Sequence, residues 1–109
     1  MDYADEIIQV LLAFFKKSLK IKRDIIVITD PVHWQMMFPK DEAHLNEKHQ
    51  EMYDVYGLSR KDDGYIFINL DTRDTFKDLF NVILHELFHI KYPKATEKQI
   101  DRLTRQYID

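Results

Sequence analysis

The residues best suited to chemistry lie in the stretch HELFHIKYPKATEKQID, residues 85–101. His85 and His89 are four positions apart, so on a helix their imidazoles lie about 6 Å apart on one face and can converge on one metal ion. Glu86 lies about 100° round the helix from His85, where it can overlook that ion without binding it. H-E-x-x-H on a helix is therefore the spacing of a two-histidine zinc site with a neighbouring general base.

A catalytic zinc site needs a third protein ligand, and the chain offers only oxygen for it. The sequence contains no cysteine, and no histidine follows His89. Thr96 and Gln99 have the spacing of a capping box, which predicts a new helix beginning at Glu97. Glu97 and Asp101 would share one face of that helix. One of them can bind the ion while the other accepts a hydrogen bond from a ligand imidazole.

A simpler interpretation needs no metal. His85 and His89 would be core histidines bonded to carbonyls, with Glu86 at the surface. Glu97 and Asp101 would be exposed acids near a helix N-terminus, where the helix dipole favours negative charge. The two interpretations differ in whether the four side chains meet.

Composition limits the setting of this motif. With 109 residues, 45% of them hydrophobic, the chain is long enough for one domain, residues 1–109, with its own core. A net charge of −3 gives no basic surface for phosphates, so we expect no nucleic-acid partner. Asp2, Asp5 and Glu6 make the N-terminus acidic, unlike a secretory signal, and the apolar run over residues 7–15 is too short to span a membrane. We therefore expect a cytoplasmic protein without a membrane span.

The rest of the sequence predicts the elements that must position the motif. Apolar residues at helical spacing predict a helix over residues 2–19, and a β-branched run predicts a buried strand over 25–28. Residues 53–59 and 65–70 flank a polar loop that ends in Asp-Gly, which predicts a hairpin. The motif helix should begin near Asp74 or Thr75 and end before Pro93. A polar helix over 41–51 completes an α+β fold, with a small, mostly antiparallel sheet of about three strands.

At residues 85–101 the sequence resembles the gluzincin zinc metallopeptidases, whose third ligand comes from a helix carrying E-x-x-x-D. The order of elements along the chain is similar to that of the minigluzincins, minimal soluble scaffolds that resemble catalytic domains of integral-membrane metallopeptidases. The resemblance implies that His85, His89 and Glu97 bind Zn²⁺ and that Glu86 is the general base and acid. It also implies that Asp101 supports the site without binding the ion.

The implied activity is that of a zinc-dependent endopeptidase acting on a peptide or protein substrate. Zinc would supply hydroxide near neutral pH, and Glu86 would carry the water proton to the leaving amine. An extended substrate could pair with the strand over residues 65–70 if that strand lies at a sheet edge. Minigluzincins are latent forms held by their C-terminal segment, so residues 107–109 are candidates for a tail that fills the cleft in a zymogen.

Two other functions stay open at this point. One is a regulatory metalloprotease that cleaves repressors, which also uses H-E-x-x-H. The other is a non-catalytic binding module in which zinc serves folding. Genomic neighbourhood would identify the first, because such a protease usually comes with a DNA-binding partner. A change of Glu86 to Gln separates the binding module from a peptidase, because a structural site would keep both its metal and its function.

Overall fold

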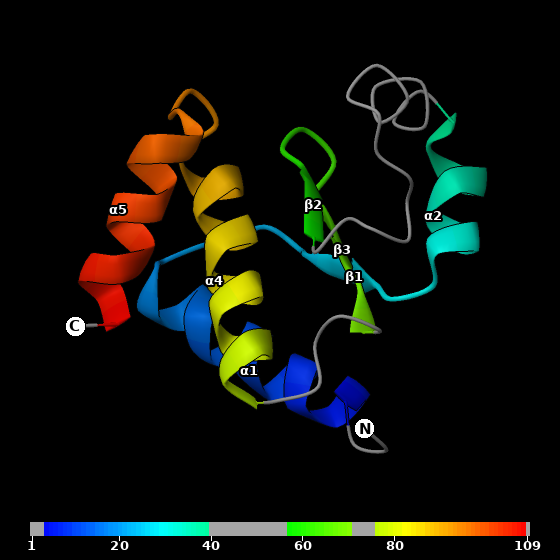
Figure 1. Cartoon of the computed structure of the whole chain (residues 1–109), viewed down its shortest axis with the longest axis horizontal. Helices are drawn as coiled ribbons and strands as arrows, with labels where there is room; N and C mark the ends of the chain where they lie inside the picture. The colour runs from blue at the N-terminus through cyan, green and yellow to red at the C-terminus, as the bar shows by residue number, and fades with distance from the viewer. Residues whose placement is uncertain (1–3, 40–56, 71–75, 109) are drawn as a thin grey trace.

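The computed structural model describes residues 4–39, 57–70 and 76–108. Figure 1 shows a small sheet with helices on both sides of it. The elements are, in chain order, α1 (Ala4–Ser18), β1 (Ile26–Ile28), α2 (Pro31–Met37), β2 (Gly57–Arg60), β3 (Tyr65–Ile68), α4 (Phe76–Lys91) and α5 (Glu97–Ile108). The α+β class predicted from the sequence is confirmed. The predicted helix over 41–51 lies outside the described residues.

The three described strands form one sheet in the order β1-β3-β2. β2 and β3 form the predicted antiparallel hairpin, with Arg60 opposite Tyr65, and Gly64 closes its turn at a φ of 73°. β1 runs parallel to β3, so the sheet is mixed rather than mostly antiparallel. β3 is therefore central and bonded on both sides. The expectation that a substrate pairs with residues 65–70 is wrong, because that strand has no unpaired edge.

The main hydrophobic core lies between the sheet and the long helices. α1 turns one stripe towards α4, and the alternating side chains Ile66 and Ile68 of β3 reach the same core. Its fully buried members are Ile8, Phe15, Ile66, Ile68, Leu79, Ile83, Leu84, Leu87 and Ile100. The core thus holds α4, which carries the motif, between α1 and the sheet.

A second, smaller core covers the opposite face of the sheet. Phe67, which points away from Ile66 and Ile68, packs with Ile28 and with Trp34 of α2. α2 begins at Pro31, shortly after β1. Asp30 is its N-cap, because the Asp30 side chain accepts a hydrogen bond from the Val32 N–H at 2.9 Å. Pro31, at the first helical position, has no backbone N–H and so needs no hydrogen-bond acceptor there. β3 is consequently buried on both faces.

The predicted helix boundaries agree closely with the structure. α1 spans Ala4–Ser18 and α4 spans Phe76–Lys91, ending two residues before Pro93 as expected. The predicted N-cap positions of α4, Asp74 and Thr75, lie outside the described residues. Among the helices that the structure describes, none has the length and apolarity needed to cross a membrane.

Candidate metal centre

α4 brings the two motif histidines together on one face. The Nε2 atoms of His85 and His89 lie 3.2 Å apart. His89 is 6% exposed, whereas His85 is more accessible. Four apolar neighbours in the helix, Ile83, Leu84, Leu87 and Phe88, are buried and fix the orientation of α4. The helix is therefore largely buried, and both imidazoles point to one place at its C-terminal end.

The capping box predicted at Thr96 turns the chain back towards these histidines. The Thr96 N–H donates to Gln99 Oε1 at 2.8 Å, and the Gln99 N–H donates to Thr96 Oγ1 at 3.2 Å. Ile100 is fully buried and anchors the first turns of α5 on the core. α5 consequently packs along α4, with Glu97 in its first turn (Figure 1).

Glu97 meets both histidines. Its Oε2 atom lies 3.1 Å from His85 Nε2, and its Oε1 atom lies 2.7 Å from His89 Nε2. All three side chains offer one ligand atom within 4.8 Å of the others. Glu97 is 71% exposed, so the group is open to solvent on this side. The interpretation without a metal expected Glu97 to be exposed, as it is, but it expected the histidines to bond to carbonyls and not to Glu97.

The geometry of the three donors fits a divalent metal ion. Two ligand atoms bound at 2.0–2.2 Å to one tetrahedral ion lie roughly 3.3–3.5 Å apart. The Nε2 atoms of His85 and His89, at 3.2 Å, and the His85–Glu97 pair, at 3.1 Å, are close to that spacing. The His89–Glu97 pair, at 2.7 Å, is shorter and has the length of a direct hydrogen bond. Two imidazole nitrogens and one carboxylate oxygen are also a donor set that suits zinc. The three residues can therefore hold an ion and leave a further coordination position open.

Asp101 lies behind His85 rather than at the group itself. Its Oδ1 atom is 3.4 Å from His85 Nδ1, the ring nitrogen that faces away from Glu97. A carboxylate at this position favours the tautomer of His85 that leaves Nε2 free to bind a metal. The corresponding atom of His89, Nδ1, is buried without a hydrogen-bond partner among the described residues.

Burial also sets the protonation state of His89. Desolvation is the main reason that the pKa of His89 is lowered from its usual 6.5, with the charges of His85 and Lys61 acting in the same direction. The nearby Glu97 carboxylate opposes this effect. His89 is consequently held in the neutral form, which is the form that binds a metal.

Glu86 is buried beside the three converging side chains of His85, His89 and Glu97, which together form the metal group. It is 6% exposed, so the interpretation that places Glu86 at the surface is wrong. Burial raises the pKa of Glu86 from 4.5 to about 8, and the negative charge of Glu97 adds to this effect. A hydrogen bond from Ser59 and the charge of Lys61 oppose it. In the metal-free protein Glu86 therefore carries its proton at neutral pH. The positive charge of a bound metal ion would favour the carboxylate form, which can accept a proton.

This pKa predicts how the stability of the metal-free protein depends on pH. The folded state holds the Glu86 proton up to about pH 8, whereas the unfolded chain releases it near its ordinary pKa of 4.5. The contribution of Glu86 to the free energy of unfolding is therefore fully present below pH 4.5 and is lost as the pH rises through 8. Urea unfolding at pH 5, 6.5 and 8, followed by the fluorescence of Trp34, should show Glu86→Gln gaining stability over wild type as the pH rises. If the difference in stability between Glu86→Gln and wild type did not change with pH, the raised pKa of Glu86 would be contradicted.

Two residues of β2 shape the surroundings of Glu86, and sequence analysis assigned neither. Ser59 forms a hydrogen bond with the Glu86 side chain. Gly57 lies so close to α4 that an added Cβ would be 2.8 Å from Val82 Cγ2 and 3.3 Å from Glu86 Oε2. Nothing in the sequence marks either residue, because each acts through contacts with a distant helix.

Gly57→Ala should therefore destabilise the fold. The new methyl group overpacks the contact between β2 and α4, at a cost of about 1–3 kcal/mol in the free energy of unfolding, measured by urea denaturation. In a double-mutant cycle, Val82→Ala should cost less in the Gly57→Ala background than in wild type, because it removes the 2.8 Å contact. Additive costs would show that the clash with Val82 is not the cause.

Three other aromatic or histidine residues, Trp34, His33 and Tyr107, lie on parts of the fold away from the metal group. Trp34 is in the second core, and His33 is on α2. Tyr107 is ten residues beyond Glu97, roughly 15 Å along α5, where its hydroxyl lies 2.7 Å from Ser18 Oγ and its ring packs on Phe15. This position does not support a tail in which Tyr107 caps the metal group. Residue 109, like the histidines at positions 44 and 49, lies outside the described residues.

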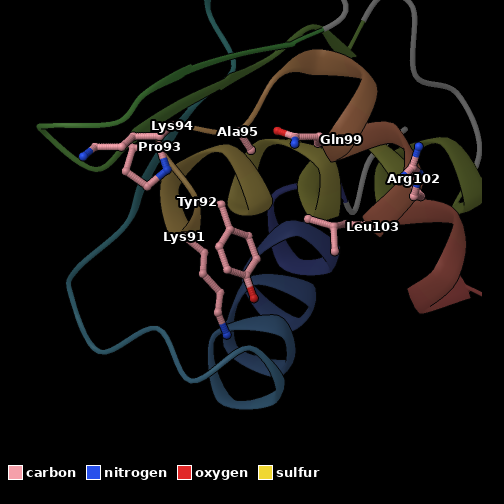
Figure 2. Close-up of a pocket in the computed structure, with 8 residues that line it drawn as sticks. All are labelled: Lys91, Tyr92, Pro93, Lys94, Ala95, Gln99, Arg102 and Leu103. Atoms are coloured by element: carbon pink, nitrogen blue, oxygen red, sulfur yellow. The ribbon is translucent and has the colours of Figure 1, made fainter.

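A hollow of about 610 Å³ lies near the metal group but is not part of it. Figure 2 shows that its lining comes from the end of α4, the connection to α5 and the side of α5 that carries Gln99, Arg102 and Leu103. These three residues lie on the face of α5 opposite to Glu97 and Asp101, given 100° per residue. The hollow and the metal group therefore open on different sides of α5.

Three comparisons with known proteins identified no relative of this chain. The chain matched no protein-family model, no curated protein and no solved structure.

Proposed function

We propose that the chain is a zinc-dependent peptidase whose metal is held by His85, His89 and Glu97. The observation that carries the proposal is the meeting of one carboxylate with both motif histidines, at 3.1 and 2.7 Å, beside a buried second carboxyl group. The resemblance of residues 85–101 to the gluzincins, and of the element order to the minigluzincins, supports the same conclusion.

Zinc held by His85, His89 and Glu97 would supply a nucleophile at neutral pH and would polarise a carbonyl group. The oxygen of the attacking water bonds to the scissile carbonyl carbon, and Glu86 accepts the proton that this water loses. When the C–N bond breaks, Glu86 returns this proton to the leaving amine. Ser59 supports this role by hydrogen bonding to the Glu86 side chain.

β2 replaces β3 as the strand suited to hold an extended substrate. Among the described strands it pairs on one side only, with β3, and it packs against α4 where Glu86 lies. A peptide added along β2 would form main-chain hydrogen bonds with the strand that packs on the Glu86-bearing helix.

A non-catalytic zinc module is the second candidate, and the ligands found among the described residues favour a catalytic site over it. Structural zinc sites are closed by four protein ligands, whereas catalytic sites use three and keep one position open. The described residues supply three that converge. A buried carboxyl group next to the ligands is costly, and it serves no purpose in a site that only holds the fold together.

The test is peptide cleavage by the purified chain loaded with one equivalent of zinc, using casein and a library of internally quenched peptides. We expect cleavage that stops when 1,10-phenanthroline removes the metal and returns when zinc is restored. A folded chain that binds zinc and cleaves no peptide would favour the binding module. A folded chain that binds no metal would contradict both functions.

A further inference from the structure

One face of β2 points its side chains at α4 and the metal group. Side chains alternate along a strand, so Gly57 and Ser59 share that face, and Lys61 is the first residue of the turn that follows β2. Leu58 and Arg60 lie on the other face, where Leu58 packs on the second core and Arg60 lies 4.3 Å from the Phe38 ring centre. Lys61 therefore directly follows the strand whose residues Gly57 and Ser59 lie against Glu86.

The Lys61 ammonium is fixed on the connection between α4 and α5. Its Nζ atom donates to the Pro93 carbonyl at 3.0 Å. Pro93 is four residues after His89 and four before Glu97, so this hydrogen bond ties the hairpin turn to the connection between the two ligand-bearing helices. The turn itself is held by Arg23, which donates to the Lys61 carbonyl at 2.8 Å.

A neighbouring contact makes the turn firmer still. Arg23 also donates to the Asp62 carbonyl at 2.7 Å, and a Cβ on Gly64 would be 2.7 Å from the Asp24 carbonyl oxygen. The backbone around Lys61 is thus held by the N-terminal part of the chain as well as by the sheet. A cation on such a turn has a defined position relative to the site.

The charge of Lys61 is not neutralised by an ion pair within the described residues, where no carboxylate oxygen lies within 4 Å of its Nζ atom. An ammonium group has three donors, and the Pro93 carbonyl accepts from one. Its field reaches the site, because it lowers the pKa of both Glu86 and His89. The remaining donors can bind an anionic group brought by a substrate.

We propose that Lys61 forms a carboxylate-binding subsite that selects peptides carrying a negative charge near the scissile bond. The inference rests on the proposed peptidase function and adds a substrate class to it. The carboxylate can come from an acidic side chain or from the C-terminus of the peptide. A hydrogen bond to a charged group is about twice as strong as one between neutral groups, which suits an ammonium with donors to spare.

The first experiment compares matched peptides in the cleavage assay. Internally quenched peptides carry Glu or Gln at each position flanking the cleaved bond, and each is made with a free or an amidated C-terminus. We expect wild type to prefer one acidic form by about tenfold in kcat/KM, and Lys61→Ala to reduce that ratio to about one. Lys61→Arg should keep the preference. The peptide that shows the effect identifies whether the carboxylate is a side chain or the C-terminus.

The matched control is Lys94→Ala, which removes an exposed lysine next to Pro93. It should keep the wild-type ratio. If Lys61 only braces the hairpin against Pro93, Lys61→Ala would lower kcat/KM equally for acidic and neutral peptides. That result, or a wild-type enzyme without acidic preference, would overturn the subsite.

A binding measurement separates the subsite from the proposed reaction. Zinc-loaded Glu86→Gln protein, with and without Lys61→Ala, is titrated with the same Glu and Gln peptides in a calorimeter. Tighter binding of the acidic peptide that depends on Lys61 would support the subsite even if wild type cleaves nothing, in which case the peptidase proposal alone fails. Equal binding of both peptides would overturn the subsite even if wild type cleaves them.

Discussion

Replacing Glu86 by glutamine is expected to lower kcat for peptide cleavage by about 10²–10⁴ while leaving one zinc ion bound per chain. Glutamine keeps the shape of the side chain but cannot accept the proton of the attacking water. Glu86 is not one of the three converging ligands, so metal content should not change. Cleavage is measured with the internally quenched peptides, and zinc by atomic absorption on the same preparation.

The matched control is Glu6→Gln, which makes the same chemical change on an exposed side chain of α1. It should leave the rate unchanged. Ser59→Ala should give a smaller loss than Glu86→Gln, because it removes only a hydrogen bond to the carboxyl group. Full activity in Glu86→Gln would remove Glu86 from the mechanism. Loss of zinc in that variant would make Glu86 a ligand, which contradicts the site described above.

Zinc binding is expected to fail in His89→Ala and in Glu97→Ala, and to weaken in Asp101→Ala. Each of the first two variants removes one of three ligands, so only two remain, too few for a stable catalytic site. Asp101 acts through His85 Nδ1, and loss of such a partner typically costs 10–100-fold in metal affinity. Competition with a chromophoric chelator at constant pH measures all three affinities.

The ranking of these variants is the informative result. Losses in His89→Ala and Glu97→Ala should exceed the loss in Asp101→Ala, and Lys98→Ala, an exposed neighbour on α5, should bind zinc like wild type. Zinc retained by Glu97→Ala but lost by Asp101→Ala would exchange the roles of the two acids. Circular dichroism of the metal-free variants separates loss of a ligand from loss of the fold.

The sequence alone determined the features that depend on helical geometry and local hydrogen bonds. The four-residue spacing of His85 and His89 puts both imidazoles on one face of any helix, whatever surrounds it. The capping box at Thr96 needs only residues within one turn, and the structure contains both of its hydrogen bonds. The hairpin follows from a polar loop ending in Asp-Gly between two apolar strands.

Other features were open in the sequence and were decided by packing between distant segments. Periodicity placed Glu97 and Asp101 on one face but could not say which one reaches the histidines. That depends on how Ile100 seats α5 against the core, which brings Glu97 to both Nε2 atoms and leaves Asp101 at His85 Nδ1.

The surroundings of Glu86 show the same division most clearly. Its place on α4 follows from the sequence, but its burial depends on β2, where Gly57 allows close approach and Ser59 supplies a hydrogen bond. The central place of β3 likewise depends on its parallel pairing with β1, a contact between remote parts of the chain. Local physical chemistry thus determined which residues can act together on each helix. Only tertiary packing decided which of them meet, because burial and strand pairing join residues whose separation in sequence carries no periodic signal.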